Sequence, residues 1–130
     1  MAEIASRQKK RPLGSPRRGE IYVVSFDPTV GHEIQKTRPA LVIQNDIGNR
    51  HSPVTIVAAI TSSLSRVRYP IEVVLHPSKT NGLDVLSAVR LDQIRSIDRM
   101  RLIRRLGAVD AATQEQVDTA LKISLGLVEI

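Results

Sequence analysis

The sequence predicts a mostly β protein with a C-terminal helix, folded as a small and mainly antiparallel barrel with the helix added at its end. Several short segments rich in β-branched residues alternate with turn-forming Gly, Pro, Asn and Asp residues, as in small all-β domains. The last segment changes to apolar residues at intervals of three and four, which is the repeat of an amphipathic helix. At 130 residues the chain has room for one domain with a single core.

Five segments have the composition of strands, and residues that favour turns end each of them. The expected strands are residues 20–26, 40–44, 54–60, 69–75 and 85–94. Residues 45–49 read NDIGN and are expected to form a turn, and Asn81-Gly82 marks a tight turn. After the fifth strand we expect a short helical turn at residues 98–102, and the residues up to 109 fit a short strand.

The final helix is expected over residues 111–126, where it contributes to the core. Asp110 or Thr113 is suited to cap it, and the spacing from Thr113 to Gln116 fits a capping box. The apolar or small residues of the repeat are Val117, Ala120, Leu121, Ser124, Leu125 and Val128.

Most of the net charge of +6 comes from the start of the chain. Residues 1–18 hold six of the nineteen Lys and Arg residues and only one acid, Glu3, so the rest of the chain carries about +1. We therefore expect a disordered basic extension over residues 1–17 and a folded domain over residues 18–130. The extension is either merely solvated or a source of non-specific attraction to phosphate.

The composition excludes several classes of site. With no cysteine there is neither a disulfide nor a thiolate zinc site, and the composition suits a reducing cytoplasm. No apolar run approaches the roughly 18 residues of a membrane-spanning helix. His32, His51 and His76 lack the spacing of zinc ligands, and no phosphate-cradling loop or nucleophile elbow is present, so we expect no metal and no cofactor.

Arg38 and Thr61 are the first two candidate site residues. Arg38 stands before Pro39 at the head of an apolar strand, and its planar fork of donors suits a phosphodiester oxygen. The alternative is a surface arginine paired with Glu33 or Asp46. Thr61 ends a strand that we expect to be buried, where its hydroxyl has access to a phosphate or a ribose, although threonine also commonly ends strands.

Arg90 and Asp92 form a second candidate pair. Residues two apart on a strand point the same way, so the two side chains lie together. Such a pair suits acid–base chemistry on a ribose hydroxyl and its leaving group, and the alternative is an exposed salt bridge. His32 lies in a loop and carries a side chain suited to acid–base chemistry, so it is a further candidate, although a loop histidine is more often merely solvated.

From Arg18 to the C-terminus the chain resembles the MazF/PemK/Kid family of toxin endoribonucleases. The matching stretches are RGEIYVVSFDPTVGHEIQKTRPALVIQNDIGN, SPVTIVAAITS, VRLDQIRSID and VDTALKISLGL. The resemblance implies an SH3-like small β-barrel and a homodimer. It further implies metal-independent cleavage of single-stranded RNA at short motifs, by attack of the ribose 2′-hydroxyl, and inhibition by a MazE-type antitoxin.

The family has two partly different active-site descriptions, and this sequence fits both. One uses the Arg of the RP motif and the Thr that ends the third strand, here Arg38 and Thr61. The other uses an Arg-x-Asp pair and a loop histidine, here Arg90, Asp92 and His32. The neighbouring positions that the resemblance assigns to RNA contact or orientation are Glu33, Ser62 and Gln93.

A rival interpretation comes from the same barrel. CcdB-like toxins share it, bind a topoisomerase and catalyse nothing, and a catalytically inactive barrel that only binds an antitoxin is a third alternative. A pure topoisomerase binder has no need of Arg38, Thr61, Arg90 and Asp92 together, so the sequence favours the nuclease.

Overall fold

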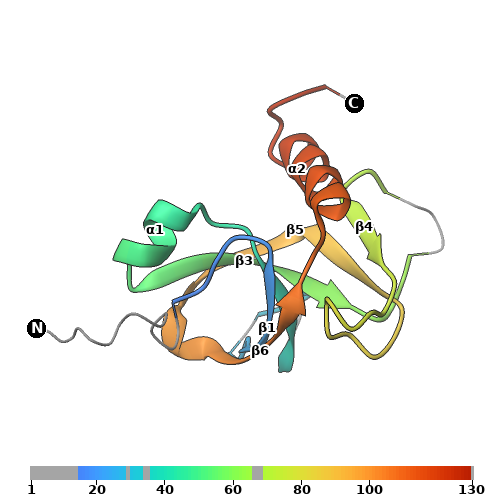
Figure 1. The fold of residues 1–130 in the computed structure, drawn as a ribbon. Helices are drawn as coiled ribbons and strands as arrows, with labels where there is room; N and C mark the ends of the chain where they lie inside the picture. The colour runs from blue at the N-terminus through green and yellow to red at the C-terminus, as the bar shows by residue number, and fades with distance from the viewer. Residues whose placement is uncertain (1–14, 29, 34–35, 66–68, 130) are drawn as a thin grey trace, which may run out of the picture.

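The computed structural model describes residues 15–28, 30–33, 36–65 and 69–129, and it forms one curled sheet with two helices (Figure 1). The elements in chain order are β1 (Glu20–Ser25), β2 (Thr37–Val42), α1 (Asp46–His51), β3 (Val54–Thr61), β4 (Glu72–Leu75), β5 (Ser87–Asp98), the 3-10 turn η1 (Arg99–Arg101), β6 (Leu102–Ala108) and α2 (Ala111–Ser124).

The six strands form one antiparallel sheet in the order β4-β5-β3-β2-β1-β6. Within the described ranges the edge strands β4 and β6 do not pair with each other, so the sheet curls without closing. The predicted mostly β fold with a C-terminal helix is confirmed, and the open, curled sheet is compatible with a small barrel.

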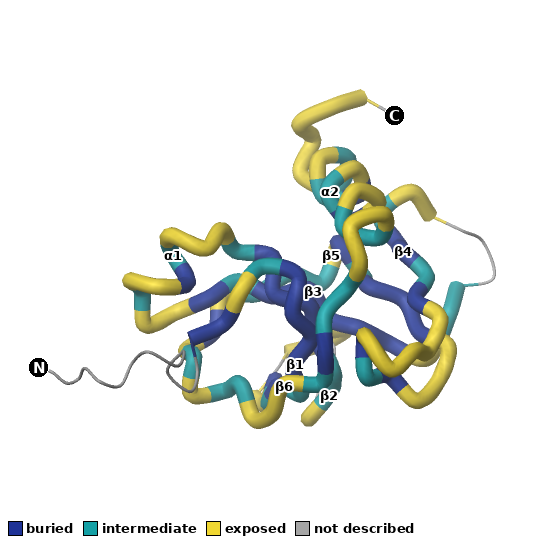
Figure 2. Tube along the Cα trace, viewed as in Figure 1, coloured by how far each residue is buried: buried dark blue, intermediate teal, exposed yellow. Residues whose placement is uncertain are grey.

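The core has a separate apolar cluster on each face of the sheet, because alternate residues of a strand point to opposite faces. One cluster joins Ile21, Leu41 and Ile60 to Val117 and Ala120 of α2. The other gathers the alternate residues of the same strands, among them Tyr22, Val24, Phe26, Ala40, Val57 and Ala59. Figure 2 shows buried residues along the middle of the sheet and exposed ones on α1, on the loops and on much of α2.

The predicted turn at residues 45–49 is wrong in kind, because α1 starts there. Asn45 caps this helix, and its side-chain oxygen accepts a hydrogen bond from the Gly48 N–H at 2.8 Å. Asn49 is fully buried and donates to the Gln44 carbonyl oxygen at 2.9 Å. Asn45 therefore supplies the cap and Asn49 the buried anchor, and together they stabilise this six-residue helix.

The strand boundaries differ most from expectation in the second half of the chain. β4 begins only at Glu72, because the backbone N–H of Glu72 closes a turn onto the Tyr69 carbonyl at 3.0 Å. β5 runs on to Asp98, and η1 and β6 follow as expected. α2 agrees with the predicted helix, and its cap is Asp110, whose carboxylate accepts from the Thr113 N–H at 2.8 Å.

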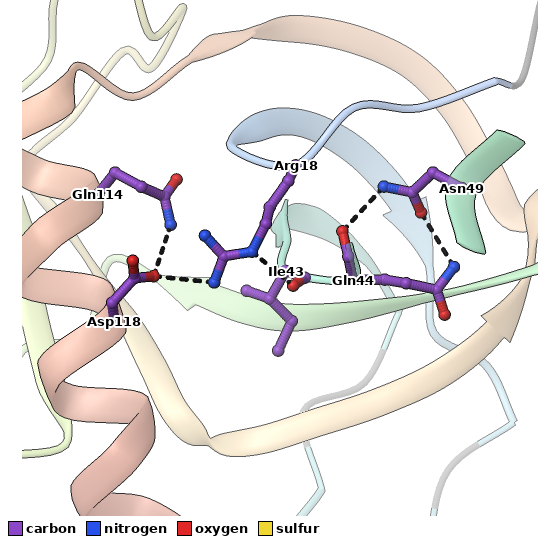
Figure 3. A network of polar contacts seen from close by, with 6 residues as sticks. All are labelled: Arg18, Ile43, Gln44, Asn49, Gln114 and Asp118. Atoms are coloured by element: carbon purple, nitrogen blue, oxygen red, sulfur yellow. Dashed lines mark hydrogen bonds and ion pairs between the residues drawn. The ribbon is translucent and has the colours of Figure 1, made fainter. Parts of the chain in front are cut away.

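The start of the described chain is held against α2 (Figure 3). The Arg18 guanidinium donates from Nε to the Ile43 carbonyl at 2.9 Å and from Nη2 to Asp118 Oδ1 at 2.8 Å. Gln114 Nε2 donates to the same carboxylate oxygen at 3.0 Å. Ser15 and Pro16 are also buried, whereas residues 1–14 of the predicted basic extension lie outside the described residues.

The Arg18–Asp118 contact predicts a loss of stability in acid. Burial acts to raise the pKa of Asp118, but the hydrogen bonds from Arg18 and Gln114 outweigh it and lower the pKa below the ordinary value. An aspartate has a pKa of about 3.9 in an unfolded chain, so this stabilisation is complete above that pH and is lost as the pH falls through the lower folded value.

We expect the free energy of unfolding to fall more for the wild type than for Asp118→Asn when the pH drops from about 6 to about 3. Urea denaturation followed by circular dichroism at both pH values measures the difference. Asp84→Asn serves as a control, because Asp84 is exposed and lines a pocket that includes neither Arg18 nor Asp118. An equal fall for the wild type and Asp118→Asn would contradict the assignment.

Candidate active site

The register of β2 and β3 brings Arg38 and Thr61 to the same place. Ala40 pairs with Ala59 in this antiparallel ladder, so continuing the register by two residues sets Arg38 opposite Thr61. Residues two apart on a strand share a face, so both side chains lie on the side of Ala40 and Ala59. Both residues line one pocket of about 270 Å³.

Pro39 explains why a pocket opens between these strand ends. The pairing of β2 with β3 stops at Ala40, one residue after the proline. The N–H groups of Leu41 and Ile43 are on the side of β3, as the bond from Ile43 to the Ile56 carbonyl at 2.9 Å shows. Pro39 occupies the preceding position of that series and has no N–H to donate, so the ladder does not reach Ile60.

The hydroxyl of Thr61 is placed to donate a hydrogen bond. Thr61 is buried, and its Oγ1 accepts from the Ser63 N–H at 3.0 Å. A hydroxyl that accepts from the backbone still has its own hydrogen to give. Arg38 is half-buried, and the exposed Ser62 lines the same pocket. Arg38, Thr61 and Ser62 therefore bring one cation and two hydroxyl groups to the same strand ends.

Asp84 and Arg104 are pocket residues that the sequence did not reveal. Asp84 approaches from the segment before β5, and Arg104 approaches from β6, where it pairs with Val23 of β1. Both are exposed. A lone aspartate in a loop and an arginine on an edge strand look like solvated residues, so no sequence signal marks them out.

Arg90 and Asp92 lie together on β5, as their spacing predicts, but outside that pocket. Arg90 donates from Nε to Asp92 Oδ1 at 3.0 Å and from Nη2 to Oδ2 at 2.8 Å. The ladder between β3 and β5 is interrupted here, since Ile60 pairs with Val89 whereas Ala58 pairs with Ile94. The pair thus sits on a bulge of β5 and forms a closed two-pronged salt bridge.

The surroundings of Arg90 favour its charged form. The hydrogen bonds to Asp92 raise the pKa of Arg90, and the charges of Asp92 and Glu72 add to this effect. Glu72 pairs with Arg90 across the β4–β5 ladder and is buried. The Asp92 carboxylate already neutralises this guanidinium, so any phosphate contact by Arg90 competes with Asp92 or uses the N–H groups that Asp92 leaves over.

The other predicted residues are not brought into the Arg38–Thr61 pocket. His32 and Glu33 lie exposed in the loop between β1 and β2, and Glu33 Oε1 accepts from the Val30 N–H at 2.7 Å. Gln93 is half-buried on the β5 bulge beside Asp92. The structure therefore forms three groups: Arg38 with Thr61 and Ser62, Arg90 with Asp92 and Gln93, and His32 with Glu33.

Two arginines fix the start of the loop that carries His32 and Glu33. Arg95 donates from Nη1 to the Phe26 carbonyl at 2.6 Å, and its guanidinium carbon lies 5.6 Å from the centre of the Phe26 ring. Arg101 donates from Nη1 to the Ser25 carbonyl at 3.1 Å and also to that of Asp27. These cations serve the fold and hold the end of β1 against β5 and η1.

Neither a metal site nor a membrane-spanning helix is found among the described residues. Within the described part of the chain, no three His, Asp or Glu side chains gather closely enough to hold a metal ion. Neither described helix is long and apolar enough to cross a membrane.

The chain matches known toxins over most of its length. The family model for PemK-like, MazF-like toxins of type II toxin–antitoxin systems matches residues 17–125. Endoribonuclease EndoA of Bacillus subtilis (strain 168) is 43% identical over 113 residues, which are 87% of this chain and 97% of that protein.

Solved structures agree with the family match. MazF of Deinococcus radiodurans superposes with a TM-score of 0.72 at 31% identity, covering 85% of this chain and 96% of that one. In a MazE–MazF complex from the same organism, the matched chain gives a TM-score of 0.68 at 30% identity, with 88% and 98% coverage. These matches do not favour the CcdB-like alternative. The chain belongs to the PemK-like, MazF-like family of toxins of type II toxin–antitoxin systems.

Proposed function

We propose that this toxin is a sequence-specific, metal-independent endoribonuclease that cleaves single-stranded RNA, including mRNA, by transesterification. The observation that carries the proposal is that Arg38 and Thr61 lie opposite each other at the ends of β2 and β3 and line one pocket, which brings a planar cation and a hydroxyl donor to the same strand ends. Membership of the family supports it, and the Bacillus relative is named an endoribonuclease.

The chemistry follows from the charges that develop on phosphorus. The ribose 2′-hydroxyl gives up its proton to a base and its oxygen forms a bond to the adjacent phosphorus. The bond to the 5′-oxygen breaks and that oxygen takes up a proton from water, so the products are a 2′,3′-cyclic phosphate and a 5′-hydroxyl. The non-bridging oxygens carry most charge midway through this step. Arg38 neutralises that charge, and the Thr61 hydroxyl donates to a phosphate oxygen.

Proton transfer needs a group that accepts the 2′-hydroxyl proton. Asp92 is the candidate base, with Arg90 as its electrostatic partner, and this role requires their salt bridge to open when RNA binds. We place Arg38, Thr61, Arg90 and Asp92 in catalysis on these grounds. His32, Glu33, Ser62 and Gln93 remain candidates for RNA contact on the surrounding loop, strand end and bulge.

The toxin has two further partners in this proposal, a cognate antitoxin of the MazE type and a second copy of itself. The solved MazE–MazF complex supports the antitoxin, since its toxin chain matches nearly the whole of this fold. We place this toxin in the cytoplasm as part of the proposal, because the mRNA that it is proposed to cleave is found there. Sedimentation of the purified chain, alone and with the antitoxin, tests both associations.

The mechanism predicts complete dependence on one hydroxyl of the substrate. An RNA that carries 2′-deoxyribose only at the scissile nucleotide should stay intact, because no nucleophile is present, whereas the all-ribose RNA should be cut at that bond in the presence of EDTA. Gel analysis of both RNAs and mass spectrometry of the new ends measure this. Cutting of the deoxy substrate would overturn the mechanism.

A further inference from the structure

The pocket beside Arg38 and Thr61 has a larger apolar lining than a phosphate site needs. Phosphate contacts are made by donor groups, whereas flat and largely apolar walls suit a ring. Ligand pockets for drug-sized molecules span roughly 300–1,000 Å³, so a pocket of about 270 Å³ suits a smaller group. Its apolar walls are Val23, Pro39, Ile60, Leu83, Val85 and Leu106.

Arg104 and Asp84 give this pocket polar groups that the fold does not use. In the part of the chain that the structure describes, neither side chain has a hydrogen bond or an ion pair, whereas the neighbouring Arg105 donates to Glu20 at 2.7 Å. Arg104 offers several donors, and Asp84 offers acceptors. They also do not pair with each other, although both line the pocket.

The backbone segments that carry Asp84 and Arg104 are joined by a tight contact. A Cβ added at Gly82 would lie 2.1 Å from the Leu106 carbonyl oxygen, and one added at Gly107 would lie 2.2 Å from the Thr80 carbonyl oxygen. The Ala108 N–H also donates to Thr80 at 3.0 Å. The segment that carries Asp84 is therefore seated directly on β6, the strand that carries Arg104.

The presence of Asp84 distinguishes between two occupants of the pocket. A second phosphate offers only acceptors and would be repelled by a carboxylate, so Asp84 opposes it. A nucleobase offers both acceptors and donors on its edge, which a guanidinium and a carboxylate read together. A base also fits the apolar walls.

We infer that this pocket holds a nucleobase next to the scissile phosphate, and that Arg104 and Asp84 discriminate among the four bases at that position. The inference rests on the proposed function, since it places the RNA through Arg38. It assigns part of the sequence preference to β6 and to the segment before β5, away from the loop of His32.

The test compares cleavage rates for RNAs that differ in one base at each position around the cut. For the wild type, kcat/KM should depend strongly on which base stands at one of these positions. In Arg104→Ala and in Asp84→Asn, kcat/KM values for the four bases at that same position should converge, with a loss of about 5- to 150-fold in discrimination. Arg50→Ala removes an exposed arginine from α1 and should keep the wild-type preference.

Two outcomes would overturn the inference. If Arg104→Ala slows cleavage equally for all bases and flattens the salt dependence, Arg104 binds a phosphate. If Asp84→Asn lowers kcat for all bases alike, Asp84 accepts a proton. Failure of the proposed function is recognised separately, because cleavage by Arg38→Ala would then equal that of the wild type.

Discussion

Arg38→Ala is expected to lower kcat for RNA cleavage by about a hundred- to a thousandfold, the usual effect of removing one preorganised donor from developing negative charge. KM should change much less, because the charge that Arg38 meets is largest midway through the reaction. Single-turnover cleavage of a short RNA measures this, and circular dichroism checks that the variant is folded. Wild-type kcat in a folded Arg38→Ala would exclude the proposed site.

Arg90→Ala is the matched comparison, since it removes the same side chain from the other candidate group. Because the Arg90 guanidinium is already bound to Asp92 and lies outside the Arg38–Thr61 pocket, we expect a smaller loss of kcat than in Arg38→Ala. Equal losses would show that the β5 pair acts in the chemical step.

Arg38→Glu should also weaken binding of an acidic antitoxin that covers the Arg38–Thr61 pocket. An unchanged affinity would place the main antitoxin contacts elsewhere.

Asn49→Ala is expected to lower the free energy of unfolding by about 2–4 kcal/mol, because it removes the Asn49 hydrogen bonds to the buried Thr55 hydroxyl and to the Gln44 carbonyl. Asn49 Oδ1 accepts from Thr55 Oγ1 at 2.7 Å and from Gln44 Nε2 at 3.0 Å, and its Nδ2 donates to the Gln44 carbonyl. Figure 3 shows its two contacts with Gln44. Urea denaturation at neutral pH measures the loss.

Asn45→Ala provides the control for that experiment within the same segment. Asn45 is exposed and caps α1 through one hydrogen bond, so its replacement should cost about 1 kcal/mol. Equal losses for the two variants would contradict the role of Asn49 as the buried anchor between α1 and β3.

Much of the fold follows from local sequence signals. Residues 20–26 are rich in β-branched and aromatic residues and contain β1, and the apolar repeat from Val117 onward marks α2, which buries one regular face. The predicted turn at residues 45–49 was wrong because turns and capped helices are rich in the same residue types. Burial of Asn49 favours the helix, and no local pattern reveals that burial. The bulge on β5 depends on pairing with two neighbouring strands, which no local pattern contains.

The residues of the candidate site were also only partly predictable from the sequence. Arg38 stood out because an arginine before a proline at the head of a buried strand is unusual, and Arg90 with Asp92 followed from the alternation of a strand. Their separation into two groups depends on strand order and on where ladders stop, which only the assembled sheet determines. Asp84 and Arg104 line the same pocket because their segments are in contact at residues 82 and 106, and neither residue has a local signal.

Pro39 weakens the pairing of β2 with β3 at the place where the proposed catalytic residues Arg38 and Thr61 lie. A residue with an N–H at this position would let β2 and β3 pair one step further and would draw together the strand ends that carry Arg38 and Thr61. Substitutions that strengthen the sheet here are therefore expected to harm function, a trade-off common at active sites. Searches for a more stable form of this toxin should begin elsewhere in the sheet.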